Sequence, residues 1–329
     1  MSAIDTQIGH AARDWLERQR GVDVKACEEI TGGAGARQYW RAHFADATRA
    51  VLMLATPEDP AILPPALRRE SERLAFVEVT RYLAGQGLPV PEILAVRPER
   101  RWVLLEDLGR THVCDLRGEA RLGRLAEAAR LLARVHALPE CEALPFERRF
   151  DAEWVRFELA TFARDARPEV DPGELDRALD ELAEAVAALP PSLCLRDYHS
   201  QNLMVDPSGR LRIIDYQDAL LAPAALDLAA LLHDSYIELS DPQRRELLDE
   251  YRAAGGAEID PRQLGLLVVQ RKCKDFGRYR YLVERRGESR YAAYLARARD
   301  SVLTGLEDLP SHLGRTSNLL RRAVGSAPA

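Results

Sequence analysis

The sequence lacks the features that would place the protein in a membrane or on nucleic acid. Its N-terminus has no basic start followed by an apolar run, so we expect neither a signal peptide nor a membrane anchor. The most apolar window, residues 219–232, is shorter than the roughly 20 residues of a membrane span and contains Pro223 and Asp227. The formal net charge of −6 provides no broad positive surface for a phosphate backbone. We therefore expect neither membrane nor nucleic acid among the partners.

The sequence also lacks paired cysteines. Its five cysteines are odd in number and scattered, and no two of them form a C-x-x-C pair. This pattern argues against a disulfide framework and against a zinc site. A reducing cytoplasm is the simplest location, so we expect a cytoplasmic protein, and we expect it to be a monomer.

What is present predicts a chain with two unlike halves. The first half begins with an amphipathic helix and continues with β-type runs at 24–33, 36–45 and 49–57. A helical stretch at 65–87 and two further strands within 90–109 follow. These elements predict a small antiparallel sheet with helices beside it.

From about residue 108 the chain changes to long helices rich in Ala, Leu, Arg and Glu, such as 118–137 and 173–188. Strand-like material in this half is confined to 192–216, and window 219–232 reads as a buried loop leading into a core helix. A length of 329 residues suits two lobes better than one small core. The sequence therefore predicts an α+β fold with two lobes, residues 1–107 and residues 108–329.

Three polar residues recur at short intervals among the apolar segments of the second half. Asn202 lies five positions after Asp197 in a loop, and Asp215 lies thirteen positions after Asn202, across a hairpin. An amide oxygen and a carboxylate form a hard-oxygen site that suits Mg²⁺, and Asp197 is then free to orient a hydroxyl and accept its proton. Each residue alone is explained as a turn former. The three together at this spacing favour the catalytic interpretation.

This pattern resembles the catalytic and metal-binding segments of the protein-kinase-like fold. Asp215 is followed by Tyr-Gln and not by Phe-Gly, which is similar to the aminoglycoside-phosphotransferase-like branch of small-molecule kinases. The segments "LRDYHSQNLM", "IIDYQDAL", "ALDLAALLHD" and "QRKCKDFG" resemble most the bacterial kinases of N-acetylmuramate and N-acetylglucosamine.

The resemblance implies a two-lobed kinase that uses ATP and Mg²⁺. It implies that Asp197 acts on the acceptor hydroxyl and that Asn202 and Asp215 hold the metal. The acceptor would be the anomeric hydroxyl of an N-acetylated amino sugar, and the product a sugar 1-phosphate for cell-wall recycling.

The first half contains a candidate phosphate loop, Gly32, Gly33 and Gly35, between two predicted strands. Backbone N–H groups of such a loop approach phosphates where side chains would clash, although a plain flexible turn has the same composition. Arg37 is placed to reach a phosphate or to cover the sheet. The segment Glu106 to Leu108 resembles the hinge whose backbone meets adenine, while the side chains of Glu106 and Asp107 need only be solvated.

One feature of kinases is missing. The third strand carries Met53 near the position of the usual phosphate-binding lysine, and no lysine occurs from 26 to 271. Either an arginine, Arg37 or Arg41, supplies the charge, or the metal and the glycine loop suffice.

Two further residues are expected to support the catalytic loop, and two to meet substrate. Arg196 directly precedes Asp197, and Asp227 begins an apolar helix from which its carboxylate braces the loop in kinase-like folds. His199 is a candidate substrate contact or a loop histidine satisfied by its neighbours. Asp218 is a candidate partner of a sugar hydroxyl or a cap of the following turn.

Gln270, Arg271, Lys274 and Arg278 form one polar ridge at helical spacing. The ridge is either a solvated face or a wall of the acceptor pocket, where Arg271 or Lys274 would pair with the lactyl carboxylate of N-acetylmuramate.

Two rival functions stay open at this point. An aminoglycoside or other amino-alcohol phosphotransferase would bind cationic acceptors, and the basic ridge argues against it. A catalytically inactive kinase-like binding protein is motivated by the missing lysine, and the intact set of Asp197, Asn202 and Asp215 argues against it.

Overall fold

The structure is a computed structural model that describes residues 8–30, 37–55, 67, 73–166 and 169–325. A five-stranded antiparallel sheet lies at one end of the molecule, with the strand order β1-β2-β3-β5-β4. The strands are β1 Val24–Ile30, β2 Arg37–Phe44, β3 Arg49–Ala55, β4 Ile93–Arg97 and β5 Trp102–Glu106. This is the sheet that the sequence predicts.

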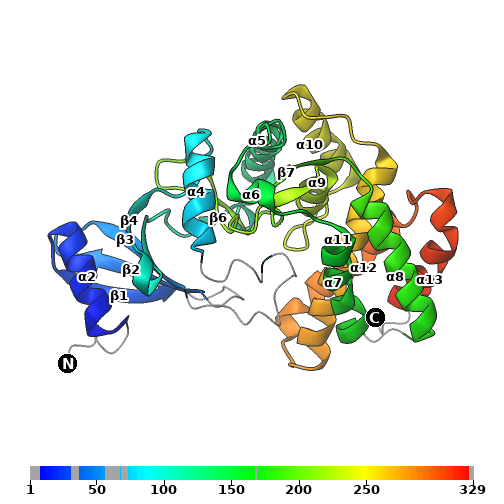
Figure 1. The fold of residues 1–329 in the computed structure, drawn as a ribbon, viewed down its shortest axis with the longest axis horizontal. Helices are drawn as coiled ribbons and strands as arrows, with labels where there is room; N and C mark the ends of the chain where they lie inside the picture. The colour runs from blue at the N-terminus through cyan, green and yellow to red at the C-terminus, as the bar shows by residue number, and fades with distance from the viewer. Residues whose placement is uncertain (1–7, 31–36, 56–66, 68–72, 167–168, 326–329) are drawn as a thin grey trace.

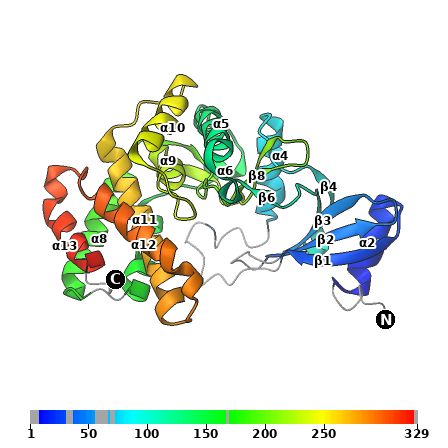
Figure 2. The same cartoon turned by 180° about the vertical axis from the view of Figure 1, so that it is seen from behind.

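A helix covers each face of this sheet, as Figures 1 and 2 show. Side chains alternate between the two faces along a strand, so Leu52 of β3 packs with helix α2 (His10–Arg20) in one apolar cluster. Met53 points the other way and belongs to the large core that includes helix α4 (Ala75–Gly85). That core continues into the rest of the molecule, so α4 connects the sheet to the helical part.

The second part is mostly helical and extends away from the sheet in both views. Its helices are α5 Gly118–His136, α6 Leu144–Glu147, α7 Ala152–Thr161, α8 Pro172–Ala187, α9 Ala225–Leu232, α10 Asp241–Ala253, α11 Pro261–Glu284, α12 Ala292–Gly305 and α13 Gly314–Gly325. The predicted α+β fold with a small sheet part and a helical part is confirmed. The boundary between residues 107 and 108 stays a prediction.

Two short sheets carry the functional loops of the helical part. One contains β6 (Thr111–His112), β8 (Leu203–Val205) and β9 (Leu211–Ile213), and the other pairs β7 (Pro191–Cys194) with β10 (Leu220–Pro223). The interpretation of the start of window 219–232 as a loop was wrong, because Leu220–Pro223 forms a ladder with β7. The sequence analysis also missed β6. Both strands are too short to show a periodic pattern of their own.

Helix α11 approaches the end of α7 closely at Gly277. A Cβ atom at Gly277 would lie 2.8 Å from the Thr161 carbonyl oxygen and 2.8 Å from the Phe162 Cα. Any larger residue would push the two helices apart. This close approach brings polar residues of α11 to α7. None of the helices in the described part of the chain combines the length and the apolar composition of a membrane span.

Candidate active site

Asp197, Asn202 and Asp215 come together at the loop between β7 and β8. The Asn202 Nδ2 donates to the Asp197 carbonyl oxygen at 3.0 Å and lies 3.4 Å from the Asp215 Oδ2. The backbone N–H of Ile214 donates to the Asn202 carbonyl at 2.9 Å. Asn202 therefore links the loop of Asp197 to the strand end that carries Asp215.

The backbone is left-handed at two positions of this site. Arg196 has φ 75° and Asp215 has φ 61°, values that side chains with a Cβ adopt rarely. Such strain persists only where the surroundings determine the conformation. Here the Gln217 Nε2 holds the Asp215 Oδ1 at 3.0 Å, and several contacts hold Arg196.

Carboxylates brace the backbone of the loop at both ends. Asp227 is fully buried at the start of α9 and accepts from the backbone N–H of Leu195 at 2.7 Å and of Arg196 at 2.8 Å. Asp234 accepts from the backbone N–H of Ser200 at 2.8 Å. The geometry of Asp227 is the one that a supporting role requires. The sequence analysis missed Asp234, although it follows α9 directly.

Glu158 of α7 is a buried hub that joins the loop to α11. Its carboxylate accepts from Arg196 at 2.8 Å and from Gln270 at 3.0 Å, and it lies 3.4 Å from the Lys274 Nζ. Burial opposes its ionisation, but the charges of Lys274 and Arg196 and the hydrogen bonds lower the Glu158 pKa to about 2. The sequence analysis did not find Glu158, because no pattern connects α7 to the catalytic loop.

Arg271 holds the predicted catalytic carboxylate. Its Nη2 donates to the Asp197 Oδ1 at 2.9 Å, and its Nη1 donates to the Arg196 carbonyl at 2.7 Å. Burial alone would raise the pKa of Asp197, but Arg271, Arg196 and Lys274 outweigh it and keep this pKa well below the usual range. Asp197 is therefore a carboxylate, and a hydrogen-bond acceptor, at every physiological pH.

The polar ridge on α11 is partly buried. Gln270 and Arg271 are buried, so the interpretation as a solvated face was wrong for them; it holds for the exposed Arg278. Arg271 and Lys274 each face a carboxylate of the chain itself. Pairing of either residue with a substrate carboxylate stays a prediction.

His199 and Asp218 lie beside the catalytic residues. The His199 ring centroid is 5.1 Å from that of Tyr236, and burial lowers the His199 pKa. The neutral form of His199 is thereby favoured. The Asp218 carboxylate accepts from Arg196 at 3.3 Å and from Gln217 at 3.4 Å. Contact of either residue with substrate stays a prediction.

On the sheet side, Gly32, Gly33 and Gly35 lie outside the described residues. Arg37 begins β2, where it is opposite Ala55 of β3. Burial and the charge of Asp215 raise the pKa of the nearby Tyr39 hydroxyl. Arg37 hydrogen-bonds to this hydroxyl and lowers its pKa. The first residues of β2 therefore lie within electrostatic reach of the predicted metal-binding carboxylate.

The residue at the position of the missing lysine and the second candidate arginine are both buried. Met53 is fully buried in the core. Arg41 is also buried, and it donates to Asp107 at 3.0 Å and to the Gly109 carbonyl at 2.6 Å. Arg41 is thus held at the hinge, and contact of Arg37 with a phosphate stays a prediction.

The hinge side chains are ion-paired, so the interpretation that they are only solvated was wrong. The Glu106 carboxylate binds Arg212 of β9 and accepts from the Glu92 backbone N–H at 2.7 Å. Asp107 is buried against Arg41, and Leu108 is buried. Contact of this backbone with adenine stays a prediction.

Comparison with known proteins decides the family. Residues 26–267 match the family described as phosphotransferase enzymes. The chain belongs to this phosphotransferase enzyme family. An N-acetylmuramate/N-acetylglucosamine kinase of Caulobacter vibrioides is 30% identical over 315 residues, which cover 82% of this chain and 85% of that protein. A protein of the same name from Pseudomonas aeruginosa is 28% identical and covers 82% of this chain and 81% of its own length.

Solved structures share the fold of this phosphotransferase. The choline kinase of Streptococcus pneumoniae matches with a TM-score of 0.63 and 14% identity, over 89% of this chain and 99% of that one. A spectinomycin phosphotransferase in complex with ADP and spectinomycin matches with a TM-score of 0.62 and 14% identity, over 95% of this chain and 98% of that one. The predicted family and the predicted enzyme class, a phosphotransferase with an alcohol group as acceptor, are confirmed.

The phosphotransferase offers oxygen ligands that fit Mg²⁺. The Asn202 amide nitrogen donates to the Asp197 carbonyl and lies 3.4 Å from the Asp215 Oδ2, so the Asn202 amide and the Asp215 carboxylate are neighbours. An amide oxygen and a carboxylate are ligand types that this ion prefers. Bound there, Mg²⁺ would neutralise charge on the nucleotide phosphates.

Proposed function

We propose that this phosphotransferase transfers the γ-phosphoryl group of ATP to the anomeric hydroxyl of N-acetylmuramate and N-acetylglucosamine. The observation that carries this proposal is the name shared by four relatives, N-acetylmuramate/N-acetylglucosamine kinase. They are 27–30% identical and cover 82–88% of this chain. The product, a sugar 1-phosphate, fits a role in the recycling of cell-wall sugars.

In the proposed reaction the anomeric oxygen attacks the γ-phosphorus while the bond to the β–γ bridging oxygen breaks, and ADP leaves. The hydroxyl proton passes to the Asp197 carboxylate. Because Arg271 keeps Asp197 weakly basic, Asp197 first orients the hydroxyl and takes the proton late. Late proton transfer agrees with the loose transition state of phosphoryl transfer. Asn202 and Asp215 would hold Mg²⁺, and Arg37 would face the phosphates.

A wall of aromatic rings beside the catalytic loop supports a sugar as acceptor. Tyr236 contacts His199 at 5.1 Å between ring centroids and Tyr294 at 5.0 Å, and Tyr279 lies 5.7 Å from Tyr294. Ring faces pack against the C–H groups of a sugar, and phenolic hydroxyls hydrogen-bond its polar groups. This aromatic wall comes from the segment after α9, from α11 and from α12.

The charges near the aromatic wall disfavour a cationic acceptor. Asp275 pairs with Lys272 at 2.9 Å, and Asp234 accepts backbone N–H groups of Ser200 and Tyr236 at 2.8 Å. Both nearby carboxylates are therefore engaged within the described part of the chain. An aminoglycoside or amino-alcohol acceptor would need carboxylates that are free to bind it.

A panel assay tests the proposal. ADP release is measured with ATP and Mg²⁺ in the presence of N-acetylmuramate, N-acetylglucosamine, glucose, choline or spectinomycin, and phosphorus NMR identifies the product. We expect acceptor-dependent turnover with the two N-acetylated sugars and an anomeric phosphate as product, with Asp197→Asn as the inactive control. Turnover with choline or spectinomycin alone would establish the amino-alcohol reading. The absence of turnover across the panel, with nucleotide still bound, would establish the binding-protein reading.

A further inference from the structure

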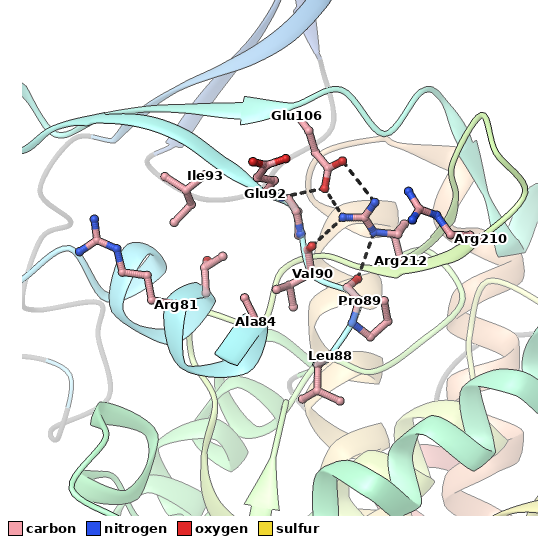
Figure 3. A pocket seen from close by; sticks show the side chains of 12 residues that line it. Arg81, Ala84, Leu88, Pro89, Val90, Glu92, Ile93, Glu106, Arg210 and Arg212 are labelled. Atoms are coloured by element: carbon pink, nitrogen blue, oxygen red, sulfur yellow. Dashed lines mark hydrogen bonds and ion pairs between the residues drawn. The ribbon is translucent and has the colours of Figure 1, made fainter. Parts of the chain in front are cut away.

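A second pocket lies behind the hinge, away from the catalytic loop. It has a volume of about 530 Å³ and is bounded by α4, the linker to β4, the end of β5 and the hairpin of β8 and β9. Figure 3 shows Arg81 at one end of this hinge pocket and Arg210 and Arg212 at the other. Pockets for small ligands have volumes of about 300–1,000 Å³. None of the catalytic or predicted metal-binding residues lines it.

The floor of the hinge pocket is apolar. It is lined by Ala84 and Leu88 from α4 and its end, by Val90 in the linker and by Ile93 of β4. Leu88 and Val90 are buried, so the apolar surface left for a ligand comes from the exposed Ala84 and the half-buried Ile93. Such a surface contributes affinity through burial of an apolar body.

Most polar groups of the hinge pocket are already bonded. Arg212 donates to the carbonyls of Pro89 and Val90 and pairs with Glu106 and Asp206. The same Asp206 Oδ2 lies 3.1 Å from the Arg210 Nε and 3.2 Å from the Arg212 Nη1. One carboxylate oxygen thus serves two neighbouring guanidinium groups.

The remaining groups favour an acceptor-rich ligand. Among the described residues, the Arg81 side chain has no hydrogen bond or ion pair, and the Arg210 guanidinium bonds only through Nε and is 70% exposed. The carboxylate of Glu92 is the one unbonded acid of the lining. The free N–H groups of Arg210 match an oxyanion in the bidentate manner that guanidinium favours, and Arg81 is a second cation at the opposite end of the pocket.

The hinge pocket is mechanically connected to both sides of the nucleotide site. Arg212 lies in β9, and Asp215 lies three positions later, just past the end of that strand. The ion-pair partner of Arg212, Glu106, begins the segment predicted to meet adenine. The backbone N–H of Ile213 donates to the Pro89 carbonyl at 2.9 Å, and that of Ile214 to the Asn202 carbonyl at 2.9 Å. A shift of the linker between α4 and β4 relative to β9 would therefore be transmitted to Asn202 and to the hinge.

We propose that the hinge pocket is a regulatory site for a small organic anion. The anionic group binds Arg210 beside Arg212, Arg81 contributes from the other end, and the apolar body covers Ala84 and Ile93. Occupation bridges α4 and the β8–β9 hairpin and changes the affinity for nucleotide. Coupling between two sites of this kind is typically about 5- to 150-fold.

Isothermal titration of phenyl phosphate into the intact, AMP-saturated chain tests the site. We expect binding that weakens about tenfold in Arg81→Ala/Arg210→Ala, since charge-assisted hydrogen bonds are lost. Ala84→Trp, which fills the pocket from an exposed position, should abolish it. Arg245→Ala, an exposed arginine on α10, is the matched control and should leave it unchanged. The proposal would be overturned if phenyl phosphate did not bind, or if both pocket variants still bound it. It would also be overturned if benzylamine, a cation of similar size, bound as tightly or more tightly.

The coupling is tested by the Kd of ATP with and without saturating phenyl phosphate. We expect a change of about fivefold or more in the wild type and none in Ala84→Trp. An unchanged Kd in the wild type would refute regulation. These readouts use no acceptor sugar, so failure of the proposed function leaves them interpretable.

Discussion

The two sides of the active site are built differently. On the loop side, two buried charged residues are engaged with partly buried partners: Glu158 with Arg196 and Lys274, and Arg271 with Asp197. On the sheet side, the strand position expected to carry a lysine is the fully buried Met53, and Arg41 turns to Asp107 at the hinge.

This difference indicates where each task is performed. The loop side presents one carboxylate, Asp197, whose ionisation and direction are set by fixed charges, as electrostatic preorganisation requires. On the sheet side Met53 occupies the β3 position expected to carry a lysine, so contact of Arg37, backbone N–H groups and a metal with the phosphates stays a prediction. Four predictions test this contrast.

The largest effect is expected for Asp197→Asn. It removes the acceptor of the hydroxyl proton, so kcat should fall about 10²- to 10⁴-fold, and Tm should also fall because the buried Arg271 loses its carboxylate partner. A stopped assay of ADP release and a thermal melt measure both. A loss of less than tenfold would mean that the loop side does not carry the chemistry.

Next is Glu158→Gln, which leaves the partly buried Arg196 and Lys274 without their carboxylate. Breaking a buried pair in this way costs about 3–5 kcal/mol of unfolding free energy, and kcat should fall because Arg196 adjoins Asp197. The matched variant Asp107→Asn breaks the buried pair with Arg41 and should destabilise the protein without lowering kcat. Urea unfolding and kcat at saturating ATP distinguish the two. A similar loss of kcat in both variants would contradict the difference between the loop side and the sheet side of the active site.

The Glu158 pair also predicts a pH dependence. Its folded-state pKa of about 2 lies below the ordinary value, so its stabilisation is present above about pH 4.5 and is lost as the pH falls toward 2. Glu158→Gln should remove that part of the acid dependence of Tm.

The third prediction concerns Met53. Met53→Lys buries an unpaired charge and should cost about 3 kcal/mol, with no decrease in the KM for ATP. Met53→Leu conserves volume and should cost less than about 1.5 kcal/mol. Urea unfolding and ATP titration measure these effects. A lower KM for ATP in Met53→Lys would show that the sheet side retains the geometry of a lysine grip.

The smallest effect is expected for Arg271→Ala. Loss of a charge-assisted contact of about 1.5–3 kcal/mol should lower kcat/KM roughly tenfold to a hundredfold. Because the depressed pKa of Asp197 then rises, the acid limb of kcat/KM should move to higher pH. The double variant Arg271→Ala/Lys274→Ala tests the predicted pairing with a substrate carboxylate, and an equal loss with both sugars would count against that pairing. A selective loss with N-acetylmuramate would assign them to its lactyl group.

Much of this molecule was predictable from local pattern. The strands of the large sheet are long enough to show alternation, and the spacing of Asp197, Asn202 and Asp215 is a local property of one loop and one hairpin. Strand β10 was missed because four residues ending in Pro223 carry no period, and its ladder with β7 joins segments far apart in the chain. Glu158 was missed for the same reason, since its partners Arg196 and Gln270 lie 38 and 112 positions away.

The sequence by itself determined the fold class, and its resemblance to known kinases indicated the family and predicts the residues that carry phosphoryl transfer, because the motifs behind both are local. Only the tertiary structure decided which charges are free to act. Arg41, Arg271 and Lys274 all looked available for phosphates or substrate, and each faces a carboxylate of the chain. The physical reason is that the partner of a buried charge is chosen by helix packing, as where Gly277 lets α11 approach α7.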